Sequence, residues 1–134
     1  MQFSEVIGQQ EAIDRLLQLV GEGRVPHALL FTGPVGCGKL ALALAFASYL
    51  LGERHNGQSL LGNDSAVLNA ETMLANWQHP DLHFSYPVIR PKGSSSAHKV
   101  TSDDFAAEWR ALLGKGPYFS MDQWMGAMEA ENQQ

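Results

Sequence analysis

One stretch of the chain spells a phosphate-binding loop, Gly33-Pro34-Val35-Gly36-Cys37-Gly38-Lys39. In the pattern G-x-x-x-x-G-K-[S/T], the glycines let backbone N–H groups turn inward and hold phosphate oxygens, and the lysine reaches the outer phosphates. The last position normally supplies a hydroxyl that ligates magnesium. Here that residue is Leu40, whose isobutyl group cannot ligate a hard cation. The sequence therefore predicts a nucleotide cradle that lacks a part needed for ATP hydrolysis.

The residues on either side of the loop place it in the expected context. Residues 27–32 are a short apolar run between Pro26 and Gly33, which is typical of a buried parallel strand. Residues 39–51 are apolar and alanine-rich with no polar face, which predicts a helix covered on most sides. Strand, glycine loop and helix in this order favour a genuine phosphate-binding loop over a chance match.

The rest of the chain predicts an α/β domain that is incomplete. Apolar spacing and turn residues predict further helices at about 9–20, 66–77, 102–113 and 120–128, a second strand at 82–89, and loops at 52–65 and 91–100. Two strands are few beside the roughly five or six of an average sheet. No later apolar strand ends in Asp or Glu, as the Walker B strand that positions magnesium would. We therefore expect residues 1–134 to be one domain with a partial parallel sheet flanked by helices, cut off before that strand.

Composition excludes several classes of protein. The 134 residues are 45% apolar and carry a net charge of −5, and the basic residues form no run, so a basic DNA-binding module is not expected. The single cysteine, Cys37, excludes an internal disulfide and leaves too few thiolates for a zinc knuckle. We find no secretory signal and no apolar run long enough to cross a bilayer. The expectation is a cytoplasmic protein without a membrane or zinc partner.

Several segments together resemble the amino-terminal part of the AAA+ clamp-loader subunits of bacterial DNA polymerase III, the gamma/tau and delta-prime proteins. The resemblance rests on Phe3-x-x-Val6-Ile7-Gly8-Gln9, on the stretch from Gly23 to Pro34, on His79-Pro80-Asp81-Leu82, and on residues 108–124. It implies a P-loop NTPase fold and a role in DNA replication. The partners that it implies are the other clamp-loader subunits and, through them, the sliding clamp and primer-template DNA.

The resemblance also implies which residues would surround a nucleotide. The backbone at Val6 and Ile7 would lie beside the adenine base, and the loop would hold the phosphates through Gly33, Pro34, Gly36, Cys37, Gly38, Lys39 and Leu40. The chain lacks the family's four-cysteine zinc module between residues 52 and 79, and it has Leu40 where motor subunits keep a hydroxyl. These two departures favour a delta-prime subunit, a scaffold within the DNA polymerase III holoenzyme without catalytic residues of its own. An arginine motif offered to a neighbour's ATP would lie beyond Gln134.

Some alternatives remain open at this stage. The loop either binds ATP or ADP weakly, without magnesium, or is a structural relic. The chain is alternatively a gamma/tau-like motor subunit truncated before its catalytic half, and less plausibly a small-molecule kinase. Cys37 is interpreted as a small filler residue, and Trp77, Trp109 and Trp124 as packing residues on apolar helical faces. An unfinished sheet predicts self-association of the isolated chain.

Overall fold

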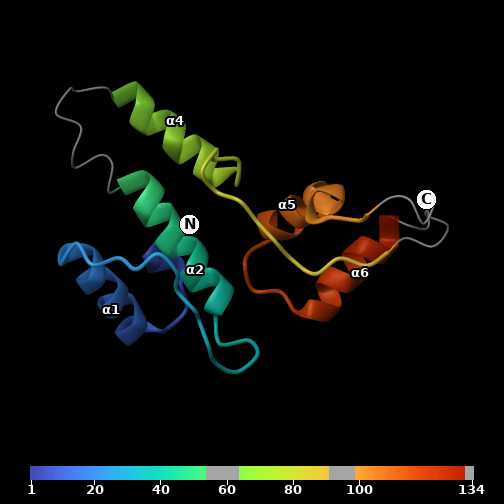
Figure 1. Cartoon of the computed structure of the whole chain (residues 1–134), viewed down its shortest axis with the longest axis horizontal. Helices are drawn as coiled ribbons and strands as arrows, with labels where there is room; N and C mark the ends of the chain where they lie inside the picture. The colour runs from blue at the N-terminus through green and yellow to red at the C-terminus, as the bar shows by residue number, and fades with distance from the viewer. Residues whose placement is uncertain (54–63, 91–98, 132–134) are drawn as a thin grey trace. The chain divides into compact units, whose positions relative to one another are not determined.

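The computed structural model describes residues 1–53, 64–90 and 99–131 (Figure 1). They fall into two units, Met1–Asp81 and Leu82–Gln134. The assignment of residues 1–134 to a single domain stays a prediction. Most of the predicted loops at 52–65 and 91–100 lies outside the described residues, although residues 52–53 and 64–65 are helical.

The first unit contains the helices predicted around the glycine loop. Its elements are the 3-10 turn η1 (Phe3–Glu5), α1 (Gln10–Gly21), α2 (Lys39–Ser48), the π-helical turn η2 (Tyr49–Glu53) and α4 (Asp64–Ala75). The predicted helices at 9–20 and 66–77 are confirmed within two residues at each end. The predicted helix at 39–51 is also confirmed, but its α-helical part ends at Ser48 and the chain continues through the π-helical turn.

Helix α2 forms the centre of this unit because it is apolar on every side, and Figure 1 shows it running between α1 and α4. On one side, Ile13 and Leu16 of α1 join Leu42 and Phe46 of α2 in a buried cluster, together with Val6. On the other side, the buried Gly52 lets α4 come close. A Cβ atom at Gly52 would lie 3.1 Å from Leu74 Cδ1, so this position has no room for a larger residue without a shift of Leu74.

The two predicted strands do not form a sheet. Within the described residues all regular secondary structure is helical, and residues 27–32 and 82–89 are extended without ladder partners. A strand is stable only when a neighbour satisfies its backbone groups, and no other described segment pairs with either run. The expectation of a partial parallel sheet is therefore not confirmed in the described part of the chain. Because no described strand covers residues 27–32, Leu30 is 87% exposed.

The second unit consists of an extended segment and helices that pack on it. Its helical elements are η3 (Ser102–Phe105), α5 (Ala106–Gly114) and α6 (Met121–Glu131). The predicted helix at 102–113 is thus split into a 3-10 turn and an α-helix. The predicted capping box at the start of α6 is confirmed, since Ser120 N–H donates to Gln123 Oε1 (2.8 Å) and Gln123 N–H donates to Ser120 Oγ (3.2 Å).

Aromatic packing holds the extended segment in place. The ring of Tyr86 stacks on Trp109 with centroids 4.3 Å apart and meets the edge of Trp124 at 4.9 Å. Trp124 Nε1 donates to Pro87 O (2.8 Å), and the Tyr86 hydroxyl donates to Ser102 O (2.7 Å). Trp109 and Trp124 are buried, which confirms their interpretation as packing residues. The predicted second strand is thus extended because side chains pin it, without a partner strand.

The third tryptophan, Trp77, departs from the predicted position on an apolar helical face. It lies two residues beyond the end of α4, half-buried, with a left-handed backbone (φ 55°).

Among the helices in the described part of the chain, none combines the length and the apolar character that crossing a membrane would require.

Tyr86 gives the second unit a testable pH dependence. Burial raises the pKa of Tyr86, and the carboxylates of Asp103 and Glu108 raise it further, against a lowering by Arg110. The unfolded phenol ionises near pH 10, so this contribution to stability is complete below about pH 10 and disappears as the pH rises through the higher folded-state pKa. Tyr86→Phe should lose about 0.5–1.5 kcal/mol near pH 8 with the hydroxyl–Ser102 hydrogen bond. The variant should then approach the parent protein above pH 10.

Urea unfolding followed by circular dichroism at about pH 8 and pH 10.5 measures both effects. Tyr118→Phe is the matched control, because it removes one phenol hydroxyl of the same unit at a residue that is 44% exposed. A constant difference between Tyr86→Phe and the parent across this range would contradict the assignment of the raised pKa.

The exposed residues 27–32 predict self-association. Leu29 and Leu30 are both exposed, and the segment is extended without a ladder partner in the described residues, so two copies can pair along this segment. Burial of a leucine contributes about 1.5–3 kcal/mol. Leu30→Lys should therefore lower the mass measured by light scattering toward the 14.7 kDa of one chain. Leu17→Lys on α1, also at an exposed leucine, should leave the mass unchanged. A parent protein that is already monomeric at high concentration would contradict the prediction.

Candidate nucleotide site

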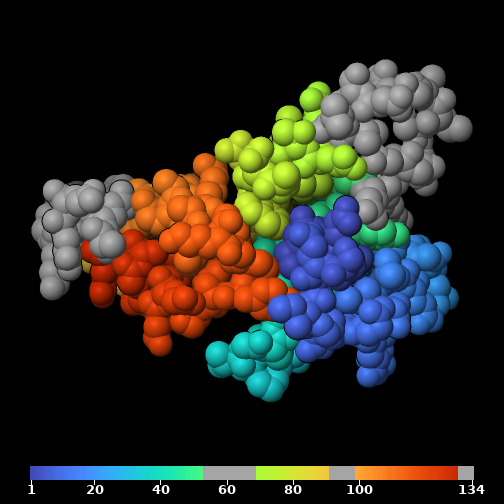
Figure 2. Space-filling model, turned by 180° about the vertical axis from the view of Figure 1, so that it is seen from behind, coloured from blue at the N-terminus to red at the C-terminus, as the bar shows by residue number. Residues whose placement is uncertain are grey.

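The glycines of the loop adopt backbone conformations that other residues rarely reach. Gly33, Gly36 and Gly38 have φ angles of 154°, 80° and 86°, in the region that favours glycine. A Cβ atom at Gly33 would also lie only 2.9 Å from Cys37 Sγ. The pattern read from the sequence is therefore the pattern that this turn requires. The loop itself lies at the surface, with Val35 96% exposed, and forms the cyan projection in Figure 2.

Lys39 folds back over the loop. Its Nζ donates to Gly33 O (2.8 Å) and Pro34 O (2.6 Å), and it lies 3.8 Å from Cys37 Sγ. The ammonium group thus satisfies two carbonyl oxygens of the loop. A nucleotide that reaches Lys39 has to replace these two hydrogen bonds. The contact with Lys39 places Cys37 inside the loop, and its thiol fills the space above Gly33.

The start of helix α2 supplies the remaining groups of a phosphate site. Gly38 is the N-cap, and Leu42 N–H makes the first helical bond, to Gly38 O (2.9 Å). The N–H groups of residues 39–41 therefore lie at the positive end of the helix dipole. Leu40 is half-buried in this first turn. It adds an alkyl group at the position where the loop pattern places a magnesium ligand.

The opening segment of the chain is tied to the loop by a residue that was not among the predicted site residues. Gln9 Nε2 donates to Cys37 O (3.0 Å), and Gln9 itself has a left-handed backbone (φ 64°) directly after Gly8 (φ 70°). A positive φ is unfavourable for glutamine. The tertiary hydrogen bond and the N-cap position of α1 therefore both hold this turn against the loop. A side chain at a helix start is a weak sequence signal for such a contact.

Val6 and Ile7 occupy different environments. Val6 is buried in the cluster between α1 and α2, and the Ile7 side chain is 76% exposed. The side chain of Val6 therefore serves the core, and only its backbone remains for contact with a base. The role of both residues beside adenine stays a prediction.

A cavity of about 310 Å³ lies beside the loop, near the lower end of the range for small-ligand sites. The residues around it come from α1, from residues 30–32 and from the start of α2: Gln9, Ala12, Arg15, Leu30, Phe31, Thr32, Cys37, Gly38, Lys39 and Leu42. It brings together three of the predicted site residues, Cys37, Gly38 and Lys39. The other six, namely Val6, Ile7, Gly33, Pro34, Gly36 and Leu40, do not line it.

Arg15 is the second residue that sequence reasoning missed. The apolar spacing assigns it to the polar face of the first helix, and the structure brings it to the cavity beside Lys39. A second cation suits an anionic ligand. The sequence shows Arg15 as a basic residue in the helix that precedes the loop. Only the packing of α1 on α2 shows that the Arg15 side chain lies at the cavity.

Comparison with known proteins agrees with the resemblance at the level of the family. A family profile described as "DNA polymerase III, delta subunit" matches residues 8–116. The Replication factor C small subunit of Archaeoglobus fulgidus is 53% identical over 51 residues, which cover 38% of this chain and 16% of that protein. Replication factor C small subunit 2 of Pyrobaculum aerophilum is 44% identical over 69 residues, or 50% of this chain and 21% of that protein.

A Replication factor C small subunit from Methanosarcina mazei is 40% identical over 67 residues, or 48% of this chain and 20% of that protein. The matches therefore span about a fifth of the length of these relatives or less. No solved structure matches the chain. The matching profile covers most of the sequence, including the whole glycine loop. The chain belongs to the DNA polymerase III delta-subunit family of AAA+ clamp loaders, whose fold is that of the P-loop NTPases.

Proposed function

We propose that this chain is the amino-terminal nucleotide-site region of a delta-prime-type clamp-loader subunit. In this role it helps to load the sliding clamp onto DNA as a scaffold, binds ATP or ADP weakly or not at all, and does not hydrolyse ATP. The observation that carries the proposal is Leu40, which puts an alkyl group in the first turn of α2 where the loop pattern requires a magnesium ligand.

The phosphate cradle itself supports residual binding. The backbone of the glycine loop, the start of α2 and Lys39 depend on no hydroxyl at residue 40. Anions bind at helix N-termini through backbone N–H groups and the helix dipole. The loop can therefore lose its magnesium ligand and still bind nucleotide. The proposal concerns mainly the loss of the magnesium ligand. Neither zinc nor magnesium is part of the proposed site.

The proposed partners are the other clamp-loader subunits. The family and the Replication factor C relatives support an assembly that acts in DNA replication. The net charge of −5 argues against tight sequence-independent binding of DNA by this region alone. We therefore propose contact with the sliding clamp and primer-template DNA through the complex.

Two observations favour a second candidate, a gamma/tau-like ATP-hydrolysing subunit. Lys39 and the glycines of the loop are intact, and Arg15 adds a second cation at the cavity. For this candidate another group has to take over the magnesium contact that Leu40 cannot make. The two candidates therefore differ in one measurable property, the effect of magnesium on nucleotide affinity.

Calorimetric titration of ATP with and without magnesium separates the candidates. The parent chain should bind weakly, with an affinity indifferent to magnesium. Leu40→Thr, which restores a hydroxyl, should acquire magnesium-dependent binding. Lys39→Ala should weaken any binding by about tenfold or less, because Lys39 gives up its bonds to Gly33 O and Pro34 O when it contacts a phosphate, and the variant loses only the difference.

Leu17→Thr is the matched control, because Leu17 is an exposed leucine on α1 that does not line the cavity. Its titration should equal that of the parent. Parent binding that strengthens markedly with magnesium would contradict the scaffold proposal and favour the motor subunit.

A further inference from the structure

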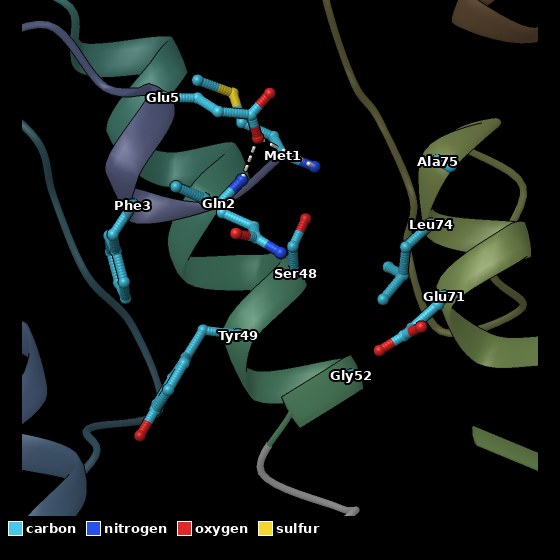
Figure 3. Close-up of a pocket in the computed structure, with 11 residues that line it drawn as sticks. Met1, Gln2, Phe3, Glu5, Ser48, Tyr49, Gly52, Glu71, Leu74 and Ala75 are labelled. Atoms are coloured by element: carbon cyan, nitrogen blue, oxygen red, sulfur yellow. Dashed lines mark hydrogen bonds and ion pairs between the residues drawn. The ribbon is translucent and has the colours of Figure 1, made fainter. Parts of the chain in front are cut away.

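A second and larger pocket lies in the same unit, away from the glycine loop. Its volume is about 440 Å³, and it is bounded by η1, the end of α2 with η2, and α4 (Figure 3). Its lining comprises Met1, Gln2, Phe3, Glu5, Ala45, Ser48, Tyr49, Gly52, Glu71, Leu74 and Ala75. The two cavities share no residue. A ligand here would therefore contact none of the residues that line the cavity beside the loop.

The wall of the pocket is shaped by an unusual helical turn. The chain leaves α2 through the π-helical turn η2, which carries Tyr49 and Gly52 into the lining. Tyr49 lies against Phe3 with ring centroids 5.6 Å apart, and Leu74 closes the opposite side beside Gly52. The pocket therefore offers aromatic and aliphatic surface to the stem of a ligand. π-Helical turns are frequent at functional sites.

The polar groups of the pocket are mainly acceptors. Glu71 extends from α4 toward the end of α2 (Figure 3) and has no partner among the described residues. Ser48 Oγ is shielded from solvent and has no hydrogen-bond partner in the described structure. The Glu5 carboxylate already accepts from Gln2 N–H and lies 4.0 Å from the amino-terminal nitrogen of Met1. Glu71 and Ser48 are thus two groups of the lining that a ligand could pair with, beside the Tyr49 hydroxyl and the Gln2 amide.

The charge of the lining selects the class of ligand. The lining contains the carboxylates of Glu5 and Glu71 and no Lys, Arg or His side chain, and its one cation is the amino-terminal ammonium of Met1, which lies 4.0 Å from Glu5. An anion would meet the Glu71 carboxylate, and a neutral apolar ligand would cover Glu71 without a partner, which is unfavourable for a charged group. A cation with hydrogen-bond donors satisfies the carboxylate, and its alkyl stem gains contact with Phe3 and Tyr49, whose rings also attract a cation.

We propose that this pocket binds an alkylguanidinium or alkylammonium group. The charged end pairs with Glu71 and donates to Ser48 Oγ, and the stem packs against the aromatic wall. The same chemistry is present in a free amine and in an arginine or lysine side chain of another protein. The two sources differ in the group at the far end of the stem, which is a second amine in one and a peptide backbone in the other. Probes that differ in this group therefore separate them.

Calorimetric titration of the 134-residue chain tests the proposal with defined probes. The probes are agmatine, the capped tripeptide acetyl-Gly-Arg-Gly-amide, and the same tripeptide with citrulline, which keeps the shape of arginine without its charge. Loss of a charge-assisted contact corresponds to about a tenfold or larger loss of affinity. The citrulline peptide should therefore bind at least about tenfold more weakly than the arginine peptide. Stronger binding of agmatine identifies a free amine as the source, and equal or stronger binding of the arginine peptide identifies a protein side chain.

Variants connect the binding to the pocket. Glu71→Gln should weaken the better cationic probe by about tenfold. Ser48→Ala should weaken it by a smaller factor without lowering the thermal midpoint, because Ser48 Oγ has no partner to lose in the unliganded protein. Glu11→Gln is the matched control, since Glu11 is an exposed helical glutamate on α1 outside the pocket. Its affinity should equal that of the parent.

Three results would overturn the proposal. They are no binding of either cation at millimolar concentration, equal affinity for the arginine and citrulline peptides, and unchanged affinity in both Glu71→Gln and Ser48→Ala. The ATP titration measures binding at a different cavity, the one beside the glycine loop. Failure of one experiment therefore leaves the other conclusion in place.

Discussion

The burial of helix α2 is the constraint on which the first unit depends. The helix is apolar on every side, so its stability requires cover from more than one direction. Helix α1 supplies one cover, with Ile13 and Leu16, and Leu74 of α4 approaches beside Gly52 on another. The same helix begins at Gly38, the last glycine of the loop. Packing of the core therefore also fixes the point at which the backbone N–H groups of the first turn are free of helical bonds.

The helices could be predicted from the sequence because their signals are local. Apolar spacing located α1, and the reciprocal Ser120–Gln123 bonds that begin α6 could be inferred from four residues of sequence. The strands could not be predicted in the same way, since a strand depends on a partner elsewhere in the chain. Residues 82–89 show the difference. They have a strand-like pattern, but Tyr86 and Pro87 hold them by contacts with Trp109 and Trp124.

The candidate site likewise has local features that the sequence predicts and tertiary contacts that it does not. The glycine positions of the loop were readable because each needs a backbone angle that favours glycine. The Gln9–Cys37 bond, the position of Arg15 beside Lys39 and the pocket between η1 and α4 were not readable. Each of these arises where elements far apart in sequence approach one another. The sequence shows that Leu40 stands where the loop pattern places a magnesium ligand. The structure adds that Lys39 already donates hydrogen bonds to Gly33 O and Pro34 O.

The engagement of Lys39 limits what the loop can gain from a nucleotide. In the unliganded loop its ammonium donates to two neutral carbonyl oxygens, those of Gly33 and Pro34. A phosphate oxygen is a stronger acceptor because it is charged, but binding exchanges these bonds and does not simply add a new one. The free energy that Lys39 adds to nucleotide binding is the difference between the two kinds of contact. This difference is smaller than the free energy of one charge-assisted contact, which is about 1.5–3 kcal/mol. With no magnesium ligand at Leu40 to add to this difference, the proposed weak binding of nucleotide is what a cradle of intact shape would give. Intact glycines and an intact lysine are therefore compatible with a subunit whose part in the complex is structural.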